Sequence, residues 1–189
     1  MKLVDKILLE GGVRPKKRLG QGETKEVYPF EKNPNYVIKY FPGHNMIKKH
    51  GYTDENAPEK IEKEIAFANK FPNLFAETFK VDYNRGILIQ ERLDTDKFQK
   101  DVLEAVERAK QFIKFGWSET GYIDNDFEHL TSRPVEFFKK KMPNDKFIFK
   151  LLRFLNSVEK AAAQTDSFSD MHVFQMGYDK RGNIKLFDL

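Results

Sequence analysis

Two carboxylates and an amide near the C-terminus have the types and the spacing that phosphoryl transfer needs. Asp170 precedes a short loop, Gln175 follows it by five residues, and Asp188 ends the returning segment 183–188. In such a reaction one carboxylate orients the attacking hydroxyl and accepts its proton, while an amide oxygen and a second carboxylate hold Mg²⁺ on the phosphates. The pattern therefore favours a phosphotransferase and makes these three residues its first candidates.

A pair of glycines near the other end of the chain could bind phosphate. Gly20 and Gly22 are one residue apart between two expected strands, where a tight turn brings backbone N–H groups close to an anion. This pattern is common in hairpins, so its meaning depends on the residues downstream of it. Val27 would cover a flat apolar ligand such as adenine, and Lys39 closes the apolar strand 36–39, where its ammonium group could pair with phosphate oxygens.

Lys39 needs a carboxylate to hold it, because a lysine at the end of a strand is by itself an ordinary surface residue. The expected helix 56–71 offers Glu62 and Glu64. Apolar residues follow Glu64 at positions +1, +3, +4 and +7, a spacing typical of a helix face that docks on a core. We therefore prefer Glu64 and keep Glu62 as the alternative.

The elements that position these residues change in character near residues 92–94. Short strands separated by Gly, Asn and Pro come first with one helix, and amphipathic helices and a final hairpin come after them. The expected strands are 13–19, 26–30, 36–40, 76–83 and 86–91, and the expected helices are 56–71, 97–115, 134–141 and 146–164, before a hairpin of 176–178 and 184–187. The region 116–133 is expected to contain no regular helix or strand. The sequence therefore predicts an α+β fold, with an antiparallel β-sheet and one helix in residues 1–93 and a mostly helical part in residues 94–189.

Composition narrows the class of protein. Of 189 residues, 40% are hydrophobic and 18 are Phe, so the chain can bury a core. The net charge of +4 comes from interleaved Lys and Glu residues, which favours a solvated surface over a nucleic-acid-binding stripe. The absence of cysteine excludes disulfides, thiolate metal sites and a cysteine nucleophile, and the four histidines lack the spacing of a zinc site. No signal peptide or membrane-spanning run is evident, so we expect a cytoplasmic protein that does not bind membranes. From the interleaved charges we also expect no binding to nucleic acid.

In their order along the chain, the candidate residues match the motifs of the eukaryotic-like protein kinase superfamily, which the sequence resembles over nearly its whole length. The matching positions are Gly20, Gly22, Val27, Lys39, Glu64, Glu91, Asp170, Gln175 and Asp188. The loop from Asp170 to Gln175 reads Asp-Met-His-x-x-Gln, which is similar to Asp-x-His-x-x-Asn in aminoglycoside and choline kinases and in small phage-encoded protein kinases. The resemblance implies a two-lobed protein-kinase-like fold with a reduced helical lobe and ATP between the lobes. It also implies Asp170 as the catalytic base and Asp188 as the chief Mg²⁺ ligand.

The resemblance further implies a nucleotide site in the first lobe. Lys39 and Glu64 would form the ion pair that serves catalysis. Glu91 and Leu93 would offer backbone groups to the adenine edge. The implied ATP-binding residues are Gly20, Gln21, Gly22, Lys25, Val27, Val37, Lys39, Glu91 and Leu93.

The sequence also departs from the pattern of that superfamily. Lys25 stands where a third glycine is usual, and it would crowd or directly contact phosphate. Gln175 replaces the metal-binding Asn and offers the same amide oxygen on a longer arm. Ser169 replaces the Arg that usually precedes Asp170, and no activation segment follows Asp188. We therefore expect a kinase core that is either naturally minimal or cut short.

The leading functional prediction is a minimal serine/threonine protein kinase that uses ATP and Mg²⁺ to modify a host or partner protein. Small-molecule kinases of this fold carry a larger helical insertion than the chain has room for. The region 116–133, with Trp117 and Tyr122, is either a docking surface or packing filler. One alternative is a pseudokinase that acts as a nucleotide-binding or protein-interaction module, and another is a small-molecule kinase or a nucleotidyl transferase. Similar minimal kinases occur in phages and among injected bacterial effectors, so we expect a monomer in the cytoplasm, including that of a host cell.

Overall fold

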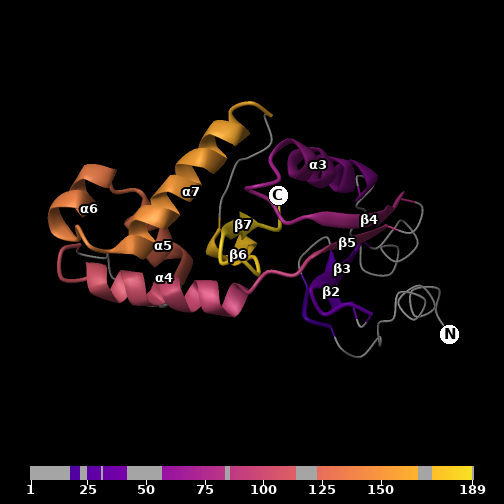
Figure 1. Ribbon diagram of the computed structural model, residues 1–189, viewed down its shortest axis with the longest axis horizontal. Coiled ribbons are helices and arrows are strands. Elements are labelled where there is room, and N and C mark those ends of the chain that lie inside the picture. Colours follow the sequence, from indigo (N-terminus) through magenta and orange to yellow (C-terminus); the bar gives the residue numbers. More distant parts are fainter. Residues whose placement is uncertain are drawn as a thin grey trace. The chain divides into compact units, whose positions relative to one another are not determined.

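The computed structural model describes residues 18–21, 25–30, 32–41, 57–83, 86–113, 123–165 and 172–188. The chain divides into two compact units, Met1–Arg92 and Leu93–Leu189, which are coloured indigo to magenta and magenta to yellow in Figure 1. Gly22, Trp117, Tyr122 and Asp170 lie outside the described residues, as does most of the expected strand 13–19. The expected α+β class is confirmed by the elements of the two units.

A five-stranded antiparallel sheet is the framework of the first unit in its described part. The strands are β1 (Gly20–Gln21), β2 (Glu26–Pro29), β3 (Tyr36–Tyr40), β4 (Thr78–Asp82) and β5 (Ile87–Glu91), in the order β1-β2-β3-β5-β4. β3 and β5 are rich in Val, Ile and Leu and occupy inner positions, where apolar side chains pack on both faces. The chain enters β5 through Gly86, whose φ is +62° and where a Cβ atom would collide with the carbonyl oxygen of Phe41. This turn therefore requires glycine.

The two faces of the sheet bury different clusters, because successive side chains of a strand point to opposite faces. One face carries the cluster of Tyr28, Ile38, Tyr40 and Ile89. The other face carries Phe41 and Leu88, on which helix α3 (Ala57–Lys70) packs through Ile61. Lys39 pairs directly with Leu88 in the β3–β5 ladder and therefore lies on the α3 face.

Four helices and a short hairpin make up the described part of the second unit. The elements are α4 (Thr95–Ala109), α5 (Ile123–Thr131), α6 (Val135–Lys141), α7 (Lys146–Ala162), the 3-10 turn η2 (Val173–Gln175), β6 (Met176–Tyr178) and β7 (Ile184–Leu186). Asp94 and Asp145 cap α4 and α7, because their side chains accept hydrogen bonds from the N–H groups of Lys97 at 3.0 Å and Ile148 at 3.1 Å. Caps of this kind stabilise a helix start by about 1 kcal/mol each.

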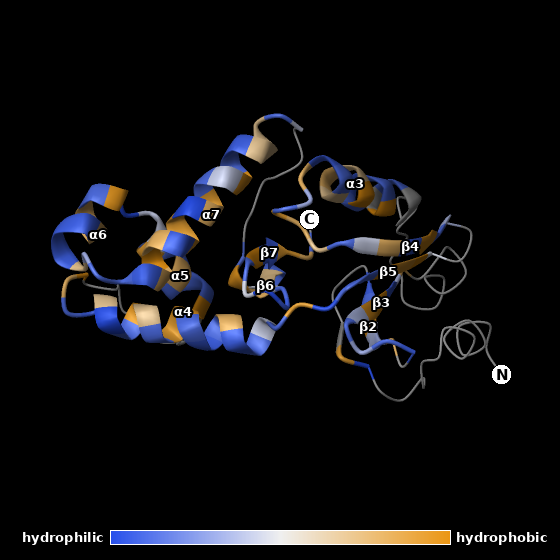
Figure 2. Cartoon of the chain, in the orientation of Figure 1, coloured by the Kyte–Doolittle hydropathy of each residue, from blue (hydrophilic) through white to orange (hydrophobic). Residues whose placement is uncertain are grey.

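The core of the second unit is formed by one face of each long helix. In Figure 2 apolar and polar positions alternate along α4 and α7, as expected for helices that bury a single face. The buried residues of α7 are Ile148, Leu151, Leu152, Phe154, Leu155, Val158 and Ala161, and those of α4 are Phe98, Val102, Ala105, Val106 and Ala109. None of the helices in the described ranges is long and apolar enough to cross a membrane.

The prediction of an irregular region over 116–133 is wrong for residues 123–131, which form α5. This helix buries only Phe127 and Leu130, and acidic residues fill its first turn, so its apolar periodicity is too weak to read from sequence. The helix expected at 97–115 begins at Thr95 and ends at Ala109, because the Asp94 cap starts it two residues earlier.

Candidate active site

The register of the first sheet brings the predicted phosphate-binding residues into one row. Gly20 pairs with Val27, and Val27 pairs with Lys39 on the next strand. Directly opposed residues of antiparallel strands point to the same face, and Val37 shares that face because it lies two residues before Lys39. Val27, Val37 and Lys39, three of the candidate nucleotide-binding residues, therefore share the face of the sheet on which α3 packs.

Helix α3 turns Glu64 toward the sheet and leaves Glu62 in solvent. Glu64 is 2% exposed and lies in the same stripe as Ile61 and Phe67, at the three-residue spacing of one helix face. Glu62 is exposed. A carboxylate with so little access to water must be paired with a positive charge, because an unpaired buried charge is strongly unfavourable.

Glu64 forms ion pairs with two lysines at once. Its Oε2 atom lies 2.8 Å from Nζ of Lys39, and its Oε1 atom lies 2.9 Å from Nζ of Lys25. The side chains of Lys39 and Lys25 are 1% and 9% exposed. Of the two glutamates that the sequence left open, Glu64 is the one that contacts Lys39. Its second pair, with Lys25, joins residues 39 positions apart and was not expected from the sequence.

The two lysines keep Glu64 ionised. Burial alone raises the pKa of a carboxyl, but the charges of Lys39 and Lys25 and the hydrogen bonds that they donate hold the pKa of Glu64 below its ordinary value of 4.5. The group is therefore a carboxylate at neutral pH and fixes both ammonium groups on the α3 face. An ammonium group held in this way is oriented before a phosphate oxygen binds to it.

The residues expected to contact adenine lie at the end of one unit and the start of the other. Glu91 ends β5, where its N–H donates to the carbonyl of Glu77 at 2.8 Å and its carboxylate accepts a hydrogen bond from the N–H of Glu77 at 3.3 Å. Leu93 is buried and lies beside Gly177. A Cβ atom added to Gly177 would lie only 2.7 Å from the Cβ atom of Leu93. Gly177 therefore permits the close approach of β6 to the segment before α4, a requirement that the sequence alone does not reveal.

The hairpin of the second unit brings the two predicted metal ligands to the same end. β6 and β7 pair through Met176 and Leu186, and the N–H of Phe187 donates to the carbonyl of Gln175 at 3.0 Å. Asp188 thus comes directly after a residue that is bonded to Gln175. A carboxylate and an amide oxygen are ligand types that Mg²⁺ prefers, so the donor set fits this ion.

The side chain of Gln175 already takes part in the structure of its loop. Its Oε1 atom accepts a hydrogen bond from the N–H of His172 at 3.0 Å, and the N–H of Gln175 donates to the backbone carbonyl of His172, also at 3.0 Å. An amide oxygen has two lone pairs, so Gln175 can bind a metal ion while it keeps this bond. Asp170, the expected base, lies outside the described ranges. Within those ranges no three His, Asp or Glu side chains form a metal-binding group.

Asp124 is a site-supporting residue that the sequence did not indicate. Its Oδ1 atom accepts a hydrogen bond from the N–H of Val173 at 3.0 Å, at the start of η2. The contact ties α5 to the loop that carries Gln175. Asp124 lies in the region 116–133, for which the sequence analysis predicted no regular structure. An acidic residue in the first turn of a helix is the sequence signal that could have drawn attention to it.

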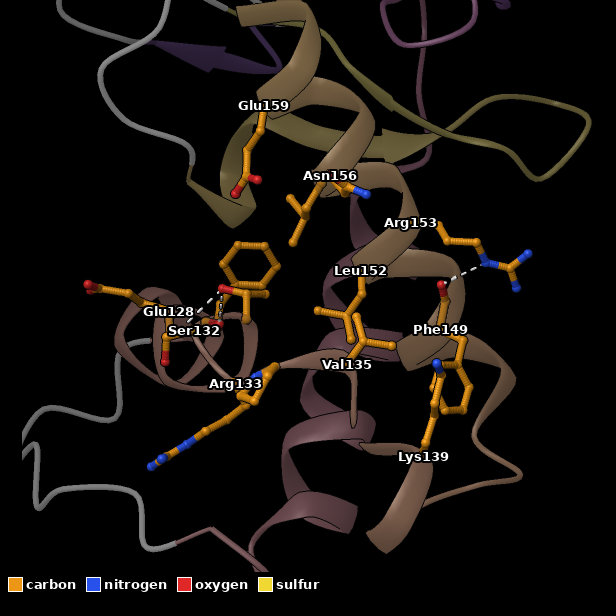
Figure 3. Close-up of a pocket in the computed structure, with 14 residues that line it drawn as sticks. Glu128, Ser132, Arg133, Val135, Lys139, Phe149, Leu152, Arg153, Asn156 and Glu159 are labelled. Carbon is orange, nitrogen blue, oxygen red and sulfur yellow. Dashed lines mark hydrogen bonds between the residues drawn. The ribbon is translucent and has the colours of Figure 1, made fainter. Parts of the chain in front are cut away.

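A separate cavity of about 670 Å³ lies within the second unit between α5, α6 and α7 (Figure 3). Val135 and Leu152 lie side by side in its apolar lining, and Arg133 and Glu159 are among the charged residues around it. None of the predicted site residues lines this cavity. It does include the last residues of the region 116–133 that the sequence suggested as a docking surface.

No family model matches the chain, and no match is found among curated proteins. Among solved structures, choline kinase LicA from Streptococcus pneumoniae aligns with 98% of the chain at 15% sequence identity and a TM-score of 0.37. The ternary complex of APH(2")-IIa with streptomycin and ATP aligns with 98% of the chain at 11% identity and a TM-score of 0.36. The chain spans 66% of the length of the first protein and 71% of the second.

Proposed function

We propose that the protein is an ATP- and Mg²⁺-dependent phosphotransferase. The observation that carries this proposal is the buried ion pair between Lys39 of β3 and Glu64 of α3, with 2.8 Å between Nζ and Oε2. The ion pair fixes Lys39 on the sheet face that also carries Val27, and Val27 in turn pairs with Gly20 at the start of the glycine loop. A fixed ammonium group beside a glycine loop is the arrangement that binds and orients the phosphate chain of a nucleotide.

The remaining roles are assigned from the motif order of the sequence. We assign Asp170 as the base that orients the attacking hydroxyl and accepts its proton. Asp188 and Gln175 would hold Mg²⁺, which neutralises charge on the transferred phosphate. The backbone bond from Phe187 to Gln175 supports this pair, because it keeps the two ligand-bearing segments together.

We propose that the phosphoryl acceptor is a serine or threonine hydroxyl of a host or partner protein. The connections from α5 to α6 and from α6 to α7 are short, so this described stretch has no room for a large substrate-binding insertion. The cavity between α5, α6 and α7 offers a concave surface for a polypeptide. We further propose that the protein acts as a monomer in the cytoplasm, including that of a host cell.

The second candidate is a pseudokinase that binds nucleotide or a partner protein without transferring phosphate. The observation that favours it is the engagement of Gln175, whose Oε1 atom accepts the N–H of His172. An amide that stays in this bond offers the metal ion only its remaining lone pair. A loss of metal affinity here would leave a folded module with little catalysis.

The two candidates separate in one experiment. The protein and its Asp170→Ala variant are incubated with labelled ATP, Mg²⁺ and a host-cell lysate, and both variants are first checked for the same thermal unfolding. A phosphotransferase gives labelled proteins only with the wild type, and equal labelling in both samples contradicts the proposal. Mass spectrometry of the targets then separates phosphate from adenylate. A wild type that gains no thermal stability from ATP contradicts the phosphotransferase and a nucleotide-binding pseudokinase, and leaves only a module that binds a partner protein.

A further inference from the structure

We propose that Lys25 is a second phosphate-binding lysine and that Glu64 positions the ammonium groups of Lys25 and Lys39 together. The role of Lys25 rests on the proposed function, because its ligand is the phosphate chain of a nucleoside triphosphate. The two ammonium groups bind different oxygens of the same carboxylate, at 2.9 Å and 2.8 Å. Phosphate binding by the first unit then needs both lysines rather than Lys39 alone.

The register of the sheet explains how Lys25 reaches Glu64. Val27 pairs directly with Lys39, and Lys25 lies two residues before Val27, so all three side chains belong to one face. Lys25 is therefore a diagonal neighbour of Lys39 across the β2–β3 ladder, at a distance that long side chains bridge. Its ammonium group also lies 5.6 Å from the ring centre of Phe41, two residues after Lys39.

Burial shows that this pairing is a built feature of the fold. Lysine loses considerable side-chain entropy when it is ordered, and its charge is costly to bury without a partner. Even so, the Lys25 side chain is only 9% exposed, and the bond to Glu64 fixes its end. The lowered pKa of Glu64 has the charges of both lysines among its causes, so both pairs depend on the carboxylate.

The charge and position of the cluster indicate the class of ligand. Its two ammonium groups are positively charged and lie on the face that also carries Val27. Lys25 follows the second glycine of the loop by three residues. A triphosphate presents several anionic oxygens, which two neighbouring ammonium groups can bind at the same time. Adenosine has no anionic oxygens. A comparison of ATP with adenosine therefore isolates the contribution of the two ammonium groups to phosphate binding.

The test measures ATP and adenosine binding by calorimetry in the wild type and in Lys25→Met, Lys39→Met and the double variant. We expect each single change to weaken ATP binding about tenfold or more, because each removes a charge-assisted hydrogen bond, and to leave adenosine binding unchanged. Lys25→Arg keeps the charge and should keep most of the ATP affinity. Lys63→Met is the matched control, because Lys63 is exposed and adjacent to Glu64 on α3.

The outcomes separate the role of Lys25 from the proposed function. Unchanged ATP binding in Lys25→Met, with a loss in Lys39→Met, overturns the role of Lys25 and leaves the phosphotransferase proposal in place. Tighter ATP binding in Lys25→Met also overturns it, since Lys25 would then compete with Lys39 for Glu64. A wild type that binds no ATP overturns both.

A measurement on the wild type covers the case in which Lys25→Met does not fold. The protein is labelled with ¹³C in its lysines, and the Cε signals of Lys25 and Lys39 are assigned with Lys25→Arg and Lys39→Arg. ATP should shift both signals, and adenosine should shift neither to the same extent. A shift of the Lys39 signal alone overturns the two-lysine site.

Discussion

The carboxylate of Asp124 accepts a hydrogen bond from the backbone N–H of Val173, at 3.0 Å and across 49 positions of sequence. The bond joins the first turn of α5 to η2, which is followed immediately by β6. A single side chain of one helix therefore holds the start of the segment that carries Gln175. This contact makes α5 a support of the candidate catalytic loop.

Removal of the Asp124 carboxylate should strongly reduce the amount of phosphorylated product and only modestly reduce the free energy of unfolding. Asp124→Ala leaves the N–H of Val173 without its partner, so we expect a loss of about 1–2 kcal/mol in the free energy of unfolding, measured by urea denaturation. We expect a larger relative loss of labelled product, because the loop is no longer held. Asp124→Asn keeps an accepting oxygen and should restore both values. Asp126→Ala, a change in the same helical turn, is the control, and equal effects from both alanine variants would contradict the role of Asp124.

Loss of Glu64 should destabilise the first unit more than loss of either lysine. Glu64→Gln leaves two buried ammonium groups beside a neutral amide, whereas Lys25→Met or Lys39→Met still leaves one matched ion pair. Breaking a buried pair by removing one partner costs about 3–5 kcal/mol, so we expect a loss of that order for Glu64→Gln and a smaller one for each lysine variant. Urea denaturation followed by circular dichroism measures the difference. Glu62→Gln, on the exposed side of α3, should have no effect, and equal losses from the three site variants would be the contrary result.

The stabilisation by Glu64 should disappear in acid. The pKa of Glu64 is lower in the folded protein than its ordinary value of 4.5, so the unfolded chain binds its proton first as the pH falls. The contribution is therefore complete above pH 4.5 and is lost as the pH falls below that value and through the folded pKa. We expect the unfolding free energies of the wild type and Glu64→Gln to differ at neutral pH and to converge in acid. A difference that stays constant down to pH 3, about 1.5 units below the ordinary value of 4.5, would show that the carboxylate charge is not responsible.

Gln90 and Thr78 should be replaceable with a gain in stability. They pair directly across β5 and β4, and within the described part of the chain their side-chain polar atoms are buried without hydrogen-bond partners. Such groups give up their bonds to water on folding, and each costs about 1–3 kcal/mol. We therefore expect Gln90→Met and Thr78→Val to raise the midpoint of thermal unfolding. A lower midpoint would show that the amide or hydroxyl has a partner in solution, such as a buried water molecule.

The elements with a strong pattern could be predicted from the sequence. β3 has the expected bounds of 36–40, and α7 begins at the expected residue 146, because β-branched residues and a broad apolar stripe define them. The choice of Glu64 over Glu62 also depended on helical phase alone. Helix α5 could not be predicted in this way, since only Phe127 and Leu130 are buried along it.

The contacts of the candidate site were harder to predict than its elements. The bond between Lys25 and Glu64 depends on the β2–β3 register, which is set by pairing of the whole ladder and leaves no mark at Lys25 itself. Asp124 and Gly177 depend in the same way on segments that are distant in sequence. The roles of Asp170 and Asp188 stay predictions from their motif, and Asp170 lies outside the described residues.

The backbone of Asp94 pairs with that of Tyr178, at 2.8 Å from the N–H of Asp94 to the carbonyl of Tyr178 and 3.2 Å in the reverse direction. This bridge closes a loop of more than eighty residues around α4, α5, α6 and α7. Contacts so far apart in sequence form slowly, because the entropy of loop closure is lost before the contact is made. During synthesis on the ribosome, Asp94 therefore cannot form this bridge until β6 has emerged. The second unit can complete its fold only after that point.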